Sequence, residues 1–440
     1  MSSDRSRPAL AALAALAIAG GSCNVRSRVV HPTFANGGLL RDATPLTASA
    51  LAQLEGVFDV DAVDEIFGRD VASRASPGRI SFFGPKEAVF AILEGGCLQG
   101  GEQLVLEGYW RYATTTDTGL VRLFVGPIES TRALCAGEKI PEGAGPLVIS
   151  GAVGREYDLP QMDLAFRWKR ALTATNDQFV VVAHHGTQTI EDYGASENTV
   201  EGFRVAEAMG ADGIELDVRI TKDSVPIMFH DASFNERLVD GRFCHGYVSD
   251  LTFAQIRASC RNKYGEKIYS LEEGLRGIID ETTVRDIWID VKETEGVAPT
   301  VKVMAEADAY AASKGRSIID VIGLSSEDLT DAFFATPEAA TTRCLIEYDP
   351  DVALAKGCVT WGPRFTEGPR AKDVQAAQEA GLAVVFWTVD GPAFMQQILR
   401  EAKPNGMITD MPGFAFYVYQ TQPWTLKGGK PGGKRGEKGQ

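Results

Sequence analysis

Carboxylate and lysine side chains follow a regular spacing in two apolar segments of the chain. Glu215 and Asp217 are two residues apart in IELDV, and Asp290 and Lys292 repeat this spacing in WIDVKE. Residues i and i+2 of a β-strand point to the same side, so each pair shares a face. Carboxylates on strands of Ile, Leu, Val and Trp are costly to bury unless a cation or another polar group compensates them. The pattern therefore predicts a hard divalent metal held by carboxylate oxygens.

Two histidines stand at the ends of similar apolar segments. His184 ends QFVVVAHHG, and His230 together with Asp231 ends VPIMFHD. An imidazole titrates near neutral pH, so it can both accept and donate a proton during a reaction. His184 and His230 are therefore candidates for proton transfer.

The segments that carry these residues alternate with helical stretches from Arg170 onward. They are QFVVVAHHG, DGIELDVRIT, VPIMFHD, RDIWIDVKE, IDVIGLSS, TRCLIEYD, GCVTWGP, AVVFWTVD and NGMITD. Such alternation predicts βα units and a parallel sheet. The link TKDS between the second and third segments is far too short for a parallel crossover, so the third must be a hairpin-like excursion. Eight strands remain, which predicts an α/β TIM barrel with functional side chains at the carboxyl ends of its strands.

Seven motifs occur in an order that resembles a known family. They are AHHG at 183–186, SENT at 196–199, GADGIELDVRITKDSVPIMFHD at 210–231, IYSLEEGL at 268–275, IDVK at 289–292, WTVD at 387–390 and GMITDMPG at 406–413. Together they resemble the glycerophosphodiester phosphodiesterase family over roughly residues 178–416. The E-x-D…H-D block is the most specific part of the match. The resemblance does not extend to residues 24–170.

The resemblance implies a metal site and a catalytic pair. It makes Glu215, Asp217 and Asp290 the metal ligands, with Ca²⁺ or Mg²⁺ as the cofactor, and it makes His184 and His230 the catalytic acid and base. The family usually has Glu where Asp290 stands, and Asp is one methylene shorter.

The same resemblance implies four substrate-binding residues. The arginine of the family's His-Arg-Gly is replaced here by His185, and Lys292 matches the family's lysine, which as a point charge can share the binding of phosphate. Glu197 is expected to border the site as a hydrogen-bond acceptor rather than as a metal ligand. For Trp387, core packing and a place in the wall of the glycerol pocket both stay open.

These roles imply a metal-dependent phosphodiesterase that releases glycerol 3-phosphate and an alcohol from a glycerophosphodiester. A phosphodiester is a poor electrophile with a poor leaving group, so it needs a cation on the phosphoryl oxygens, one base and one acid. Attack by water and attack by the adjacent glycerol hydroxyl both stay open. The alternatives are a lysophospholipase D or another headgroup phosphodiesterase, or a catalytically weak barrel that scaffolds a lipid- or polymer-binding β domain.

The region 54–169 has a different pattern. Residues alternate in period two in segments such as QLVLEGYWRYA and LAFRW, and glycine-rich turns separate them. This pattern predicts an antiparallel β-barrel or sandwich of about seven or eight strands, loosely similar to a lipocalin. A ligand-binding pocket and a purely structural module are equally compatible with it. The chain is therefore predicted to be multi-domain, with this all-β domain preceding the TIM barrel at 170–420.

The two ends of the chain have the composition of accessory segments. Arg5 and Arg7 precede the apolar run Ala9–Ala19 and then GGSC, which indicates an export signal over 1–23, with a linker over 24–53. Small residues before Cys23 also resemble the lipidation site of bacterial lipoproteins. The expected location is therefore periplasmic, membrane-attached as a lipoprotein, or secreted. Residues 421–440 are rich in Gly and Lys and are expected to be a disordered basic tail.

Cysteine usage indicates the redox compartment of the protein, and net charge limits the classes of partner. Six cysteines besides Cys23 form sequence-local couples, predicted as the disulfides Cys97–Cys135, Cys244–Cys260 and Cys344–Cys358, which suit an oxidising compartment. The hydrophobic share of 44% excludes a disordered chain. A net charge of −15 disfavours nucleic acid as a partner. The family resemblance implies a small glycerophosphodiester or lysophospholipid as the partner.

Overall fold

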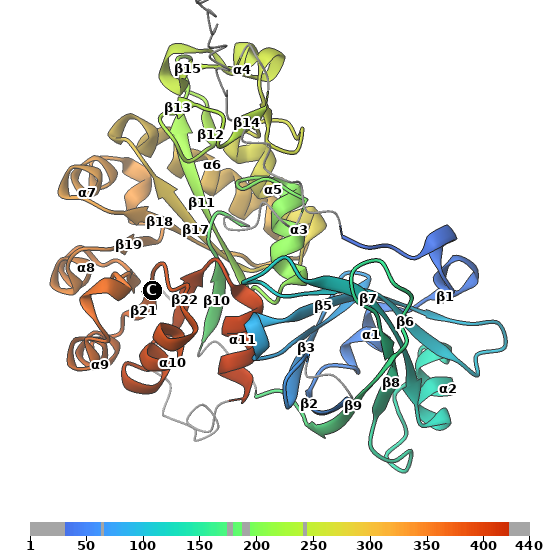
Figure 1. The fold of residues 1–440 in the computed structure, drawn as a ribbon. Helices are drawn as coiled ribbons and strands as arrows, with labels where there is room; N and C mark the ends of the chain where they lie inside the picture. The colour runs from blue at the N-terminus through green and yellow to red at the C-terminus, as the bar shows by residue number, and fades with distance from the viewer. Residues whose placement is uncertain (1–30, 63–65, 174–178, 187–193, 241–243, 422–440) are drawn as a thin grey trace, which may run out of the picture.

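The computed structural model describes residues 31–62, 66–173, 179–186, 194–240 and 244–421. These residues form an all-β part and an α/β part, which lie side by side with helix α11 between them (Figure 1). The predicted export signal, Cys23 and nearly all of the predicted basic tail lie outside the described residues.

The all-β part is a closed antiparallel barrel. Its strands are β2 (Val57–Ala62), β3 (Asp70–Ser76), β4 (Arg79–Phe83), β5 (Phe90–Cys97), β6 (Leu104–Arg111), β7 (Thr118–Gly126), β8 (Val148–Val153) and β9 (Met162–Arg170). Each strand pairs with the next one along the chain, and β9 pairs with β2 to close the ring. The predicted antiparallel barrel is thereby confirmed.

Period-two alternation in these strands serves two different cores. One set of side chains, including Phe58, Phe82 and Phe166, fills the barrel interior, where the Phe82 and Phe166 rings are 4.7 Å apart. Residues of the other set, such as Phe83 and Phe90, join the hydrophobic core of the α/β part. The aromatic filling of the interior favours a packed structural module over an open ligand-binding cup.

Residues just before the barrel belong to it structurally, although the sequence analysis placed them in a linker. Strand β1 (Thr44–Pro45) pairs with β5, and helix α1 (Ala48–Ala52) buries Ala50 and Leu51. A second helix, α2 (Ile128–Ala136), packs on β7. The segments that form β1, α1 and α2 are too short to show a clear apolar periodicity in the sequence.

The α/β part is a closed barrel of eight parallel strands. They are β10 (Val180–Ala183), β11 (Gly213–Ile220), β17 (Asp286–Val291), β18 (Ile319–Leu324), β19 (Cys344–Ile346), β20 (Thr360–Trp361), β21 (Ala383–Phe386) and β22 (Gly406–Thr409). Pairing of β10 with both β11 and β22 closes it. Strand β12 (Pro226–Met228) pairs antiparallel with β11, as the short TKDS link required. The predicted TIM barrel with one hairpin excursion is confirmed.

Helices follow most of the parallel strands. They are α3 (Val200–Ala208), α5 (Leu271–Glu281), α6 (Thr294–Ser313), α7 (Glu327–Phe334), α8 (Pro350–Lys356), α9 (Ala371–Glu379), α10 (Pro392–Glu401) and α11 (Pro412–Thr421). Local sequence sets their ends: Ser270 and Glu273 form a reciprocal capping box at the start of α5, and Gly357 ends α8 in the left-handed conformation. Within the described part of the chain, no helix combines the length and apolarity that crossing a membrane requires.

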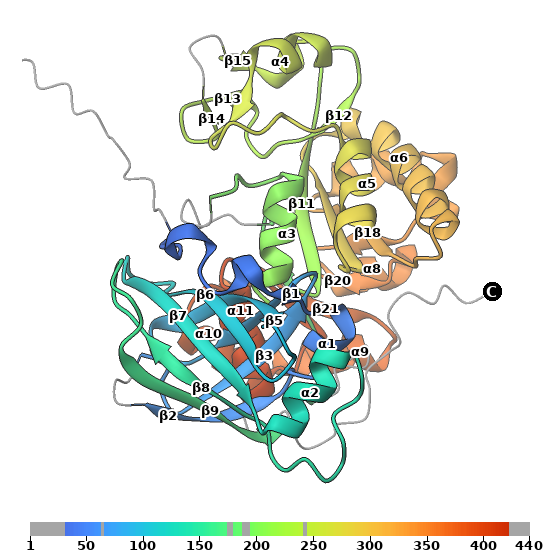
Figure 2. The same ribbon diagram turned by 90° about the vertical axis from the view of Figure 1, so that its right-hand side faces the viewer.

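An insertion after β12 extends beyond the end of β11, away from the all-β barrel (Figure 2). Its elements are β13 (Ser233–Phe234), β14 (Val239–Asp240), β15 (Gly246–Tyr247), α4 (Phe253–Ser259) and β16 (Arg261–Asn262). Phe229, Phe234 and Ile256 belong to a small hydrophobic cluster of its own. The disulfide Cys244–Cys260 links the two halves of this insertion.

The three predicted disulfides are all present. Besides the bond in the insertion, Cys97–Cys135 ties the end of β5 to α2. Cys344–Cys358 ties the start of β19 to the segment that leads into β20. All three cysteine pairings proposed from the sequence are therefore confirmed.

The two parts of the molecule share a polar and aromatic interface. Arg74 of β3 lies 2.6 Å from Asp212, the residue just before β11. The Phe83 ring packs edge-on against Phe416 of α11, with ring centroids 5.7 Å apart. The Tyr417 hydroxyl of α11 donates to Asp70 at 2.6 Å. The all-β barrel thus contacts the α/β barrel near the amino end of β11.

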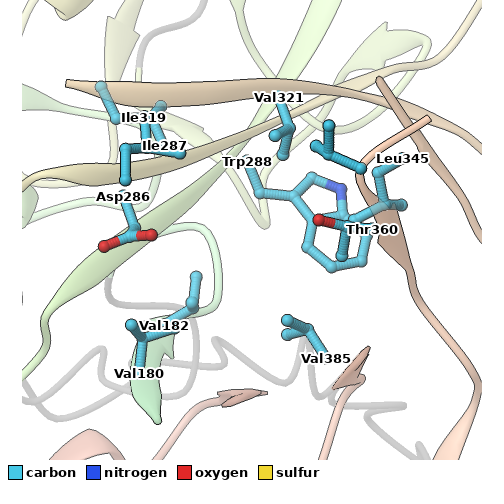
Figure 3. Close-up of a pocket in the computed structure, with 11 residues that line it drawn as sticks. Val180, Val182, Asp286, Ile287, Trp288, Ile319, Val321, Leu345, Thr360 and Val385 are labelled. Carbon is cyan, nitrogen blue, oxygen red and sulfur yellow. The ribbon is translucent and has the colours of Figure 1, made fainter. Parts of the chain in front are cut away.

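A tryptophan occupies the interior of the α/β barrel. Figure 3 shows the indole of Trp288 among Val321, Leu345 and Thr360, which line a small cavity of about 40 Å³. Gly323 of β18 makes room for this ring, because a Cβ placed on it would lie 2.5 Å from Trp288 Nε1.

We expect Gly323→Ala to destabilise the protein by about 1–3 kcal/mol, the usual cost of overpacking a core. The measurement is the midpoint of denaturant unfolding. Gly143→Ala is the matched control, because a Cβ at Gly143 meets no atom within 4 Å. An unfolding midpoint for Gly323→Ala equal to that of the control would contradict this account of the barrel interior.

Candidate active site

Three carboxylates meet toward the carboxyl ends of two neighbouring strands. Asp217 of β11 is opposite Asp290 of β17 in the parallel register, and Glu215 precedes Asp217 on the same face. Oxygen atoms of the three side chains lie within 4.8 Å of one another. Glu215 is 4% exposed and Asp217 is 0% exposed. The structure therefore brings together all three residues that were predicted to bind a metal.

Lys292 partly compensates this negative charge. Its Nζ lies 2.7 Å from Asp217 Oδ1 and 2.5 Å from Asp290 Oδ2. Burial, followed by the charge of Asp217, raises the pKa of Glu215 well above its usual range. Burial also opposes ionisation of Asp217, but neighbouring positive charge, with the Lys292 ammonium 2.7 Å away, outweighs it and holds the pKa of Asp217 below its usual range. A single lysine does not neutralise three carboxylates.

The donor set fits a divalent metal. Asp290 Oδ1 is buried and accepts no hydrogen bond within the described part of the chain. Clustered carboxylate oxygens are the ligands that hard cations such as Ca²⁺ and Mg²⁺ prefer. A cation among Glu215, Asp217 and Asp290 would also remove the cost of burying like charges side by side.

Hydrogen bonds from neighbouring residues orient two of the carboxylates. Asn198 Nδ2 donates to Asp217 Oδ2 at 2.8 Å, and Asn198 Oδ1 accepts from the Asp217 backbone N–H at 2.9 Å. The backbone N–H of His185 donates to Glu215 Oε2 at 2.7 Å. Asn198 has a φ of +57°, a left-handed conformation that Asn tolerates better than most residues. Asn198 is thus a positioning residue for the acidic cluster.

Each of the two predicted catalytic histidines is held by its own carboxylate. His184 Nδ1 lies 2.8 Å from Asp410 Oδ1, and His230 Nδ1 lies 2.6 Å from Asp231 Oδ1. Burial alone would lower the pKa of His184, but the hydrogen bond to Asp410 and nearby carboxylate charges outweigh it and raise this pKa to about 9. Because the carboxylates occupy Nδ1, Nε2 of each ring is left for proton transfer.

His185 lies between the two other histidines, in a more enclosed position than a phosphate contact needs. Its ring centroid is 3.8 Å from that of His184 and 4.8 Å from that of His230. Its Nε2 is 3.2 Å from Asp217 Oδ2, and the residue is 1% exposed. Burial holds the pKa of His185 well below its usual range. The ring therefore lies against the acidic cluster, although the resemblance makes His185 a substrate-binding residue.

The remaining predicted substrate residues surround this cluster. Glu197 accepts from Arg237 of the insertion at 3.2 Å and has an oxygen 3.7 Å from His185 Nδ1, so it borders the site. Burial raises the pKa of Glu197 to about 7, although Arg237 opposes this. The Trp387 indole N–H donates to the Gly362 carbonyl at 2.7 Å, which fixes the ring at the end of β21.

Sequence reasoning missed several residues that the fold brings to the site. Asp410, which holds His184, ends the segment NGMITD, and Glu347 is the first residue after β19. Burial and the charge of Asp290 raise the pKa of Glu347 to about 8. The strand-end rule that selected His184 could have selected both. Asn198 and Arg364 lie in loops and carry no such signal.

A model of the glycerophosphoryl diester phosphodiesterase family matches residues 183–414, which is more than half of the chain. The chain is similar to a glycerophosphodiester phosphodiesterase of Caldanaerobacter subterraneus, with 27% identity over 53% of this chain and 94% of that protein. It is 35% identical to human glycerophosphodiester phosphodiesterase 1 over 26% of this chain, a match that spans about a third (34%) of the human protein.

Among solved structures, a putative glycerophosphoryl diester phosphodiesterase from Silicibacter pomeroyi matches 54% of this chain and 91% of its own, with a TM-score of 0.45 and 21% identity. The residues matched by the family model include His184, Glu215, Asp217, Asp290 and Asp410. The chain therefore belongs to the glycerophosphoryl diester phosphodiesterase family.

Proposed function

We propose that this chain is a metal-dependent phosphodiesterase that hydrolyses glycerophosphodiesters to glycerol 3-phosphate and an alcohol. Membership of the family and the similarity to named glycerophosphodiester phosphodiesterases support the substrate class. The observation that carries the proposal is the buried cluster of Glu215, Asp217 and Asp290 beside two histidines that are each held by a carboxylate.

Glu215, Asp217 and Asp290 would hold the cation, and we propose Ca²⁺ or Mg²⁺ because all three side chains offer oxygen ligands. When bound, such a cation would supply positive charge to the phosphoryl oxygens and so favour attack at phosphorus. Lys292 lies against Asp217 and Asp290 and would add a second positive charge on the same side.

His184 and His230 would carry the two proton transfers. One imidazole accepts the proton of the attacking hydroxyl, from water or from the adjacent glycerol hydroxyl, while the new P–O bond forms. The other donates its proton to the alcohol oxygen as the old P–O bond breaks. On the second route the product is a cyclic phosphate, which water then opens to glycerol 3-phosphate. Asp410 and Asp231 hold Nδ1 of the two rings, which keeps Nε2 available for these transfers.

We also propose that the protein is exported. The basic, apolar and small-residue order of residues 5–23 supports an export signal, and three paired cysteine couples suit an oxidising compartment. Attachment to a membrane through a lipid on Cys23 is part of the same proposal.

The first prediction concerns the reaction itself. Purified protein incubated with glycerophosphocholine should release glycerol 3-phosphate, measured with a coupled glycerol 3-phosphate dehydrogenase assay. Excess chelator should abolish the signal, and added Ca²⁺ or Mg²⁺ should restore it. Full activity in excess chelator would exclude a metal-dependent reaction, and failure to release glycerol 3-phosphate with either metal would count against this substrate.

The second prediction concerns the metal ligands. Asp217→Asn keeps the shape of the side chain but removes its charge, so binding of Ca²⁺ or Mg²⁺ in a calorimetric titration should weaken at least about tenfold. Turnover should fall with it. Asp163→Asn, an exposed carboxylate on β9, serves as the control and should bind metal as the wild type does. Equal metal affinity in both variants would remove Asp217 from the site.

The third prediction concerns the histidines. His184→Ala and His230→Ala should each lower kcat by at least about 10²-fold, the usual effect of losing a positioned proton-transfer group. His245→Ala removes an exposed histidine of the insertion and should leave kcat unchanged. If either of the first two variants kept the wild-type kcat, its assigned role in proton transfer would be wrong.

A further inference from the structure

The cations around the acidic cluster are largely occupied by carboxylates. Lys292 contacts both Asp217 and Asp290. Arg219 of β11 is paired with Glu293 at 2.7 Å. A divalent cation and Lys292 together would only just neutralise the three carboxylates, so binding of an anionic phosphodiester gains from a further cation whose charge is not already paired.

Another arginine, in the insertion, is also paired with carboxylates. Arg237 lies 2.8 Å from Asp231 and 3.2 Å from Glu197. Its two carboxylate partners take up the donors on one side of its guanidinium. Arg237 therefore ties the insertion to the site rather than offering a free charge to a ligand.

Arg364 differs from these cations. It is exposed, and within the described part of the chain its guanidinium makes no ion pair. The guanidinium carbon lies 4.7 Å from the centre of the Trp387 ring. Stacking on an aromatic face fixes the plane of a guanidinium and leaves its N–H edges free to bind an anion.

Backbone contacts place Arg364 at the same mouth of the barrel as the histidines. Arg364 follows β20 and forms a parallel bridge with Trp387, the first residue after β21. The next residue, Thr388, has its hydroxyl 3.4 Å from His184 Nε2. Arg364 is thus separated from the catalytic imidazole by one stacked tryptophan and its neighbour.

The charge of Arg364 also acts on a carboxyl group near the acidic cluster. Burial and the charge of Asp290 raise the pKa of Glu347, the first residue after β19, and the charges of Lys292 and Arg364 lower it. A guanidinium within this range strengthens the attraction for an anion at the metal carboxylates.

We infer that Arg364 is a substrate-binding residue whose guanidinium contacts the phosphoryl oxygens of the substrate from the side opposite Lys292. The inference rests on the proposed function. It also gives this chain a guanidinium, the group that the family resemblance expects at position 185. The residue at that position, His185, lies buried against Asp217. A planar guanidinium can bind two phosphoryl oxygens at once, which a single imidazole cannot.

The test uses Arg364→Gln in the metal-loaded full chain, with inorganic phosphate and sn-glycerol 3-phosphate as probes in calorimetric titrations. We expect both probes to bind at least about tenfold more weakly, as is typical for the loss of a charged hydrogen-bonding partner. KM for glycerophosphocholine should rise by a similar factor, and Arg364→Lys should recover part of the loss. Metal affinity and the thermal unfolding midpoint should stay at the wild-type values.

Arg370→Gln is the matched control. Arg370 also lies over a tryptophan, 4.8 Å from the centre of the Trp361 ring, but its guanidinium is paired with Glu367 at 2.6 Å and Asp373 at 3.0 Å. We expect this variant to bind both probes as the wild type does. Equal weakening in the two variants would show a general charge effect and overturn the inference.

Wild-type affinity for both probes in Arg364→Gln would also overturn it, as would a wild-type chain that binds neither probe. The binding titration separates this inference from the proposed reaction. If glycerophosphocholine is not hydrolysed but phosphate binding still depends on Arg364, the anion contact stands and the proposed substrate is rejected.

Discussion

Repulsion among Glu215, Asp217 and Asp290 is the constraint on which the rest of the site depends. Two adjacent parallel strands in register place these carboxylates within a few ångströms of one another and largely out of water. Lys292, Asn198 and the backbone N–H of His185 each contribute a compensating contact. These compensating groups come from β17 or from the loops that follow β10. The compensating groups of His185 and Asn198 therefore reach the acidic cluster through the pairing of β10 with β11.

The division of labour among the histidines follows from the same constraint. His184 and His230 each bind a carboxylate outside the metal cluster, which sets their ring orientation without adding to the crowding at Glu215. His185 instead turns toward Asp217 and gives up its exposure to solvent. The three imidazole rings lie next to one another but have two kinds of environment, even though His184 and His185 are adjacent in the sequence.

Much of the barrel and of the metal site could be predicted because their signals are local. A spacing of two residues on a strand already determines that Glu215 and Asp217 share a face, and the short TKDS link already excludes a parallel crossover. Orientation could not be predicted, since whether His185 points into a cleft or against Asp217 depends on the loop after β10. Asp410 and Glu347 stand at strand ends, but their partners lie on strands distant in sequence. Strands β2–β5 bury one set of side chains inside the all-β barrel and the other set in the core of the α/β part. The second set could not be predicted, because it becomes buried only through the contact between the two barrels.

The hydrogen bond between Tyr417 and Asp70 joins positions 347 residues apart and has a consequence for the order of assembly. During synthesis from the amino terminus, the all-β barrel emerges first. All of the strands that close it lie in this first part of the chain. The outer face of β3 and β4 is then covered in part by α3 and fully only when α11, the last helix, emerges. The last-made helix thus completes the cover of the first-made domain. Loss of the final ten residues of the α/β barrel would therefore be felt in the stability of the domain at the other end of the chain.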